Sequence, residues 1–183
     1  MTDQFIWVGQ HPGLDFCNTE PVVDGVLVEL LEGPEALAAW AAEAGLPAVA
    51  PGALSDRTVR WSRALRDGLS AALDPPEQDP DRLGHVDAVL RPVRGTLGLA
   101  PAPDPRLVLR SDDPDAQFRL DLAAATVPAL ALDPDRVRRC ANPACVLLFH
   151  DVSKAGRRRW CDMATCGNRA KAAAHLARSR SAG

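Results

Sequence analysis

Two cysteine pairs near the end of the chain constrain its folding more than any other feature. Cys140 and Cys145 form the first pair, Cys161 and Cys166 form the second, and fifteen residues separate the two pairs. Zn²⁺ accepts four thiolates in a tetrahedron at about 2.3 Å, so such a site brings four chain positions close together. The sequence Asn142-Pro143 favours a turn inside the first pair. The spacing therefore predicts one closed Zn²⁺ site built from all four cysteines.

Other uses of the cysteines fit the sequence less well. Two disulfides require an oxidising compartment, and residues 1–5 have neither the basic nor the apolar region of a secretory signal. A catalytic cysteine lacks an obvious base to pair with it. His150 is the other candidate ligand in this window, but a lone histidine beside Phe149 is more often a packed or surface residue. Cys17 stands alone in an apolar setting and is expected to be a small core residue.

The residues around the second cysteine pair resemble a known zinc-binding family. The segment RRWC at 158–161 is followed by CGNR at 166–169, and an F-x-D-x-S pattern stands at 149–153. Over about residues 136–180 the chain thus resembles the CGNR zinc-finger family. Members usually carry an N-terminal ABATE domain, and LDFCNT at 14–19 is similar to a stretch near the start of that domain. The resemblance implies a Zn²⁺-binding transcription regulator.

Charge is distributed unevenly along the chain. Residues 1–133 hold ten arginines and 21 acidic residues, a balance of −11, whereas residues 134–183 hold eleven basic and three acidic residues, a balance of +8. A basic segment joined to an acidic body predicts an anionic partner for the basic segment, and DNA is the expected one. The chain has no apolar run of about eighteen residues, so no membrane span is expected, and the cytoplasm is the expected location.

The chain is expected to form two domains of α+β class: an ABATE-like domain over residues 1–133 and a zinc finger over residues 134–183. In the first domain we expect a strand at 5–8 and a hairpin at 22–28, where Gly25 after Asp24 supplies the positive φ of a tight turn. About three helices are expected, and the periodicity and caps place them at 34–45, 55–73 and 83–97. Alternating polar and apolar residues predict two antiparallel strands at 106–110 and 117–122. Strands, then helices, then strands again favour α+β over alternating β-α-β units.

Three polar residues follow one another closely near the N-terminus. Asp15, Asn18 and Thr19 lie on or after a segment, 14–16, that is expected to be extended. They indicate either turn and capping hydrogen bonds or a pocket for a small-molecule ligand. No Ser-His-Asp set, carboxylate pair or phosphate-binding glycine loop has a recognisable spacing, so no enzyme activity is expected.

The finger itself is expected to be treble-clef-like. The pattern predicts a knuckle at the first cysteine pair, a hairpin between 146–150 and 157–161, and a helix beginning after Cys166. Trp160 is expected to cover the metal site. Alternation along 157–159 places the first and third arginines on one face and the second on the other, while at 100° per residue Lys171 and Arg178 share one side of the helix. The candidate nucleic-acid contacts are Arg157, Arg158, Arg159, Arg169, Lys171, Arg178 and Arg180.

Three classes of function remain open from the sequence. The first is a DNA-binding regulator, whose finger docks on DNA while the N-terminal domain senses a ligand or forms a homodimer. The second is a zinc module used for protein interaction or for structure alone, because a single finger has little area for specific DNA recognition. The third is a small-molecule sensor or enzyme in the N-terminal domain. A zinc with four thiolates has no open position, so the metal is not expected to be catalytic.

Overall fold

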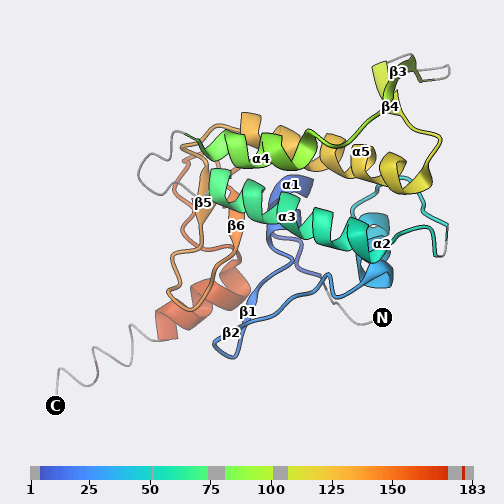
Figure 1. Ribbon diagram of the computed structural model, residues 1–183. Coiled ribbons are helices and arrows are strands. Elements are labelled where there is room, and N and C mark those ends of the chain that lie inside the picture. The colour runs from blue at the N-terminus through green and yellow to red at the C-terminus, as the bar shows by residue number, and fades with distance from the viewer. Residues whose placement is uncertain (1–4, 51, 74–80, 101–106, 173–178, 180–183) are drawn as a thin grey trace.

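The computed structural model describes residues 5–50, 52–73, 81–100, 107–172 and 179. Helix α3 packs against both α4 and α5, and three two-stranded antiparallel sheets lie around these helices (Figure 1). This confirms the α+β class. The elements in order are α1 (Pro12–Cys17), β1 (Val22–Val23), β2 (Val26–Leu27), α2 (Pro34–Glu43), α3 (Asp56–Leu73), α4 (Arg82–Leu90), β3 (Thr96–Leu99), β4 (Leu107–Arg110), α5 (Pro114–Thr126), η1 (Val127–Ala131), β5 (Val137–Arg139), β6 (Leu148–His150) and η2 (Met163–Gly167). No helix among these residues is long and apolar enough to cross a lipid bilayer.

The six-residue helix α1 lies at the centre of the molecule. We call the part up to residue 133 the body and the part from residue 134 the finger. Helix α1 contacts α3, α5 and η1 of the body and β6 of the finger. His11 caps its first turn by accepting a hydrogen bond from the Gly13 N–H, and Pro12 supplies a φ suited to the first helical position. Leu14 and Phe16 are fully buried. The prediction of extended chain at 14–16 was therefore wrong, because a proline-led cap starts a helix there.

The β1–β2 hairpin forms as the sequence predicts. Asp24 and Gly25 both have positive φ, at 51° and 84°. Two consecutive positive φ values define the turn type that matches the twist of a two-residue hairpin. The predicted helices at 34–45 and 55–73 are also present, as α2 and α3.

Several predicted elements differ from the structure. Residues 117–122 form part of helix α5 and not a strand, because Asp113 caps a helix that Pro114 begins, and the buried residues Phe118 and Leu122 lie one turn apart. The helix expected over 83–97 ends at Leu90, shortly before Pro92, and the chain then enters β3. The predicted strand at 106–110 is present as β4, but its partner is β3. Residues 5–8 form no regular strand.

Apolar packing crosses the predicted boundary between the two domains. Val137 of β5 and Leu148 of β6 belong to the same buried cluster as the residues of α1, α2 and α3. In the other direction, Ile6 and Val8 pack against the cluster that contains the finger cysteines. The two parts of the chain are therefore packed against each other through apolar side chains and not only joined in sequence.

Gly13 permits the close packing of α1 against the end of α5. A Cβ atom at this position would lie 2.2 Å from the backbone oxygen of Thr126 and 2.6 Å from the Cβ of Ala129. Both are fixed points of the fold, so neither can move aside without shifting the backbone. We expect Gly13→Ala to lower the free energy of unfolding by about 2 kcal/mol or more through overpacking. Chemical denaturation followed by circular dichroism measures the loss.

The matched control for this prediction is Gly33→Ala. Gly33 precedes α2, its φ is that of extended chain, and an added Cβ would meet only the end of the Glu35 side chain at 3.7 Å. If the two variants lost the same stability, the packing explanation for Gly13 would be wrong.

Candidate metal centre

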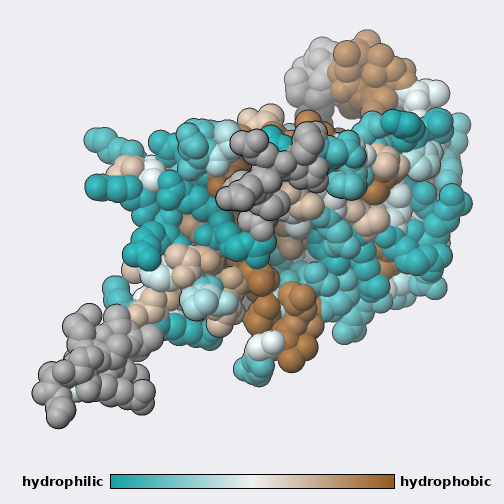
Figure 2. Space-filling model, turned by 60° about the vertical axis from the view of Figure 1, so that its left-hand side comes forward, coloured by the Kyte–Doolittle hydropathy of each residue, from teal (hydrophilic) through white to brown (hydrophobic). Residues whose placement is uncertain are grey.

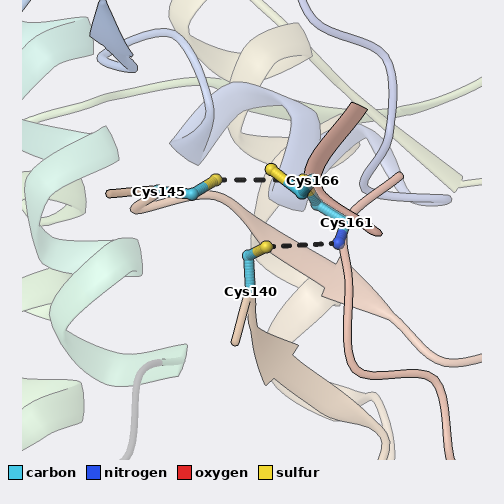
Figure 3. Close-up of side chains that lie close together, drawn as sticks. All are labelled: Cys140, Cys145, Cys161 and Cys166. Atoms are coloured by element: carbon cyan, nitrogen blue, oxygen red, sulfur yellow. Dashed lines mark hydrogen bonds between the residues drawn. The ribbon is translucent and has the colours of Figure 1, made fainter. Parts of the chain in front are cut away.

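The four predicted cysteines form one cluster. Their sulfur atoms all lie within 4.8 Å of one another, and the Sγ atoms of Cys145 and Cys161 are 3.8 Å apart (Figure 3). In a tetrahedral site with Zn–S bonds of about 2.3 Å, the sulfur atoms are separated by about 3.8 Å. Three of the four cysteines are buried and Cys145 is half-buried. The donor set and its spacing therefore fit a closed, four-thiolate zinc site.

The first cysteine pair lies on the turn that joins β5 to β6. The N–H of Cys140 donates to the carbonyl oxygen of Leu147, and the N–H of Cys145 donates to the carbonyl oxygen of Asn142, so the chain reverses between the two cysteines. The Asn142 side chain accepts a hydrogen bond from Ala144 N–H and donates one to Cys166 Sγ at 3.5 Å. The sequence predicted the turn at Asn142 but not its contact with the second pair.

The second cysteine pair straddles the start of the last helix. Asp162 caps this helix by accepting hydrogen bonds from the backbone N–H and the hydroxyl of Thr165. The π-helical turn η2 then carries Cys166, and residues 168–172 continue as α-helix. The helix thus begins earlier than predicted, with Cys166 inside its first turns. Backbone N–H groups at a helix start favour a negatively charged sulfur.

The strand pairing in the finger differs from the prediction. β6 pairs with β5, so the hairpin flanks the first cysteine pair, and residues 157–161 form no strand. Ala141 N–H nevertheless donates to the Arg159 carbonyl oxygen, and Cys161 N–H donates to Cys140 Sγ at 3.5 Å. One backbone–backbone hydrogen bond and one bond to a cysteine sulfur thus hold the returning segment where a second strand pairing was expected.

The sulfur atoms also influence one another's ionisation. The hydrogen bond from the Cys161 thiol lowers the pKa of Cys145 to about 5, against the raising effect of burial. The same pairing raises the pKa of Cys161, and burial raises the pKa of Cys140. One thiolate is therefore favoured before metal arrives, and the remaining thiols release protons when Zn²⁺ binds.

Asp151 is a buried carboxylate that sequence reasoning placed only within a family-like pattern. It accepts hydrogen bonds from the backbone N–H groups of Ser153 and Arg158, and Arg138 lies 4.0 Å away. Hydrogen bonding from Ser153 and Arg158, together with the charge of Arg138, lowers the pKa of Asp151 to about 2. The carboxylate thus fixes both ends of the loop 151–158, which carries the arginine run toward the metal site.

Residues 136–179 match the family model described as CGNR zinc finger. The match covers the cluster, the β5–β6 pair and the start of the helix, and this supports the resemblance drawn from the sequence. No curated protein matches the chain. The ABATE assignment of the N-terminal part lies outside the matched residues and stays a prediction.

Within the described residues, the structure separates the candidate DNA-contacting residues of the finger into exposed and half-buried side chains. Arg157 and Arg159 are exposed, whereas Arg158 is half-buried, which agrees with the predicted alternation. The guanidinium of Arg158 lies over the Phe149 ring and donates to the carbonyl oxygens of Trp160 and Cys161. These contacts within the chain give Arg158 a structural role. Arg169 and Lys171 are exposed on the helix. Arg178 and Arg180 lie outside the described residues.

Trp160 packs where the sequence predicts. It is half-buried against the cysteine cluster, and the Arg159 guanidinium lies 5.2 Å from its ring centre. Gly167 follows Cys166 where a Cβ atom would come within 3.3 Å of Trp160 Cδ1 and 2.8 Å of Met163 Sδ. The glycine of the CGNR motif thus allows the tryptophan to lie close to the helix start.

The three residues of the predicted ligand pocket all have partners within the fold. Asp15 accepts a hydrogen bond from Gly9 N–H, and the Thr19 hydroxyl donates to the Phe16 carbonyl oxygen. The Asn18 amide donates to the Leu148 carbonyl oxygen and accepts from the Leu148 N–H, at 2.9 and 2.8 Å. These contacts give the burial of the three side chains a structural reason, and a ligand at this place stays a prediction.

Replacement of one ligand tests the metal site. We expect Cys161→Ser to lose bound Zn²⁺ and to unfold the described part of the finger, because metal-binding free energy is folding free energy in so small a unit. Metal analysis by mass spectrometry and amide hydrogen exchange over residues 137–172 measure both effects. Cys17→Ala is the control, since burial raises the pKa of the Cys17 thiol to about 12 and it lies outside the cluster. A Cys161→Ser protein that kept one equivalent of zinc would contradict this site.

Asp15 predicts a specific pH dependence. Burial raises its pKa to about 6, although hydrogen bonds from Gly9 and Val8 act in the opposite direction. The unfolded value is about 3.9, so between about pH 4 and 6 the folded state binds more protons and stability falls as pH rises. Asp15→Asn keeps the acceptor for Gly9 and removes the charge. We expect the stability of this variant relative to wild type to increase from pH 4 to pH 7, by on the order of 1 kcal/mol after solvent screening.

Urea denaturation of both proteins at several pH values measures this difference. Asp24→Asn, on the exposed β1–β2 turn, is the matched control and should show no such trend. A difference that stayed constant from pH 4 to 7 would show that burial does not keep the Asp15 carboxyl protonated.

Proposed function

We propose that the chain is a zinc-dependent DNA-binding regulator whose finger docks on DNA. The observation that carries this proposal is the exposed arginine pair, Arg157 and Arg159, held beside the metal site by a loop anchored at Asp151. The pair lies in the segment with a balance of +8. Arg169 and Lys171 add exposed positive charge on the helix that follows.

The metal acts in this proposal as a structural element. A zinc with four thiolates has no open coordination position, so it supplies folding free energy and no catalysis. Zinc joins the turn at Cys140–Cys145 to the start of the helix, and the arginine run leads directly into the third ligand. Loss of zinc would release the arginines from their fixed spacing, so DNA affinity is expected to require metal.

Salt dependence of binding provides the test. A random-sequence DNA duplex should bind at low salt, and the slope of log K against log salt should become shallower by about 0.9 for each phosphate contact removed. Arg157→Ala with Arg159→Ala is therefore expected to reduce the slope by about 2. Fluorescence anisotropy measures the affinity across a salt series. If the wild-type protein did not bind DNA at low salt, the proposal would be wrong.

Two further variants separate surface contacts from effects on folding. The double variant Arg57→Ala with Arg60→Ala changes two exposed arginines on α3 and should leave the slope unchanged. Arg158→Ala is expected to lower stability and zinc retention, because its guanidinium holds the backbone next to Cys161. An equal change of slope for all three variants would mean that general charge, and not this surface, drives binding.

A second candidate function rests on the shared core. Val137 and Leu148 of the finger lie in the core of the body, which suits a zinc unit that stabilises the chain or presents a surface to another protein. In that case zinc removal would lower the melting temperature of the whole chain, while wild type would bind no DNA. Partners recovered after nuclease treatment would favour the interaction variant of this role.

A further inference from the structure

The β3–β4 hairpin projects from the body and carries leucines on one face. Leu97 is paired with Leu109 and Leu99 with Leu107 across the two strands. Because side chains alternate along a strand, these four leucines share one face of the hairpin. They are 69, 49, 64 and 68% exposed, respectively. Figure 2 shows this hairpin as an apolar projection, and we call residues 96–99 and 107–110 the leucine arm.

So much exposed leucine is unusual for a protein that acts as a monomer. Four leucines at this exposure form a patch on the order of 400 Å², a size that generally marks an interaction site. A two-stranded hairpin by itself is also only marginally stable in water. A partner that buried the apolar face of the leucine arm would therefore also stabilise its two strands.

The arm is held in a defined position at its base. Gln117 of α5 accepts a hydrogen bond from Ser111 N–H at 2.8 Å and donates to the Leu109 carbonyl oxygen at 3.4 Å. Gly95, just before β3, lies against Leu120, where a Cβ atom would come within 2.6 Å of Leu120 Cδ1. The arm is thus fixed to α5 and presents its leucine face in a set direction.

An apolar groove lies beside the base of the arm. Two hollows of about 490 and 370 Å³ share Leu109, Leu120 and Ala124 in their walls. The smaller hollow is completed by Leu90, Val93 and other apolar side chains. The same chain thus offers both a projecting apolar element and an apolar surface able to receive one.

We propose that the leucine arm is a homodimerisation element that packs against the leucine arm and groove of a second copy of this chain. An interface around a twofold axis requires one patch that is complementary to itself, and the arm and its neighbouring groove meet this requirement. A patch on the order of 400 Å² with the groove that adjoins it approaches the roughly 800 Å² that each partner buries in a stable complex. This inference does not rest on DNA binding, because the arm lies on the body.

The oligomeric state of the full chain tests the proposal. We expect wild type to sediment as a dimer at micromolar concentration, and Leu99→Lys to raise the dissociation constant by about tenfold or more. Leu27→Lys is the matched control, since Leu27 is 57% exposed on the separate β1–β2 hairpin. It should leave the dimer unchanged. Circular dichroism and zinc content show whether each variant is folded.

A second pair of measurements covers the case in which a lysine disrupts the hairpin itself. In wild type, amide protection at 96–99 and 107–110 should increase with protein concentration, whereas protection of α3 should not. Mixing Leu99→Lys with Leu99→Glu should restore dimers through opposite charges. A monomeric wild type, a dimer unaffected by Leu99→Lys, or arm protection independent of concentration would overturn the proposal.

Discussion

The buried pair of hydrogen bonds between Asn18 and Leu148 joins the two parts of this molecule. An amide side chain that both donates to and accepts from one residue of a strand imitates a strand neighbour, and it satisfies both backbone groups of Leu148 in β6. Leu148 N–H and carbonyl groups are buried, so leaving them unpaired would cost on the order of 1–3 kcal/mol each. The position of the finger on the body follows from this pair and from the apolar contacts around it.

The central helix places the residue that makes this contact. α1 brings Leu14 and Phe16 into the core, and Asn18 follows at its C-terminal end. Asp15 points back to Gly9, whose carbonyl oxygen accepts from His150 N–H. Residues 5–9 are thereby held against the finger, and Ile6 and Val8 cover the cysteine cluster. The cysteine cluster, α1 and the N-terminal segment thus pack together in a single arrangement.

Elements with local causes could be predicted from the sequence, whereas those with distant causes could not. The β1–β2 turn follows from Asp24-Gly25, and the metal cluster follows from the chemistry of four thiolates. The alternation of polar and apolar residues at 117–122 predicted a strand. The segment is helical instead, because the Asp113 cap and Pro114 start a helix that continues through it. The partner of β4 was missed because Pro92 stops α4 before β3, and no residue in β4 specifies which strand it will meet. In the finger, the chemistry of the ligands was predicted but the route of the chain between them was not.

The separation of 130 residues between Asn18 and Leu148 has a consequence for synthesis of the protein. A chain made from its N-terminus completes α1, α2 and α3 long before β6 exists, so the face of α1 that receives β6 stays open during translation. Contacts between such distant residues form late because closing long loops costs entropy before any packing is gained. The part of the core that contains Leu148 can therefore close only after β6 has been made, and the four cysteines can meet only once Cys166 has followed it.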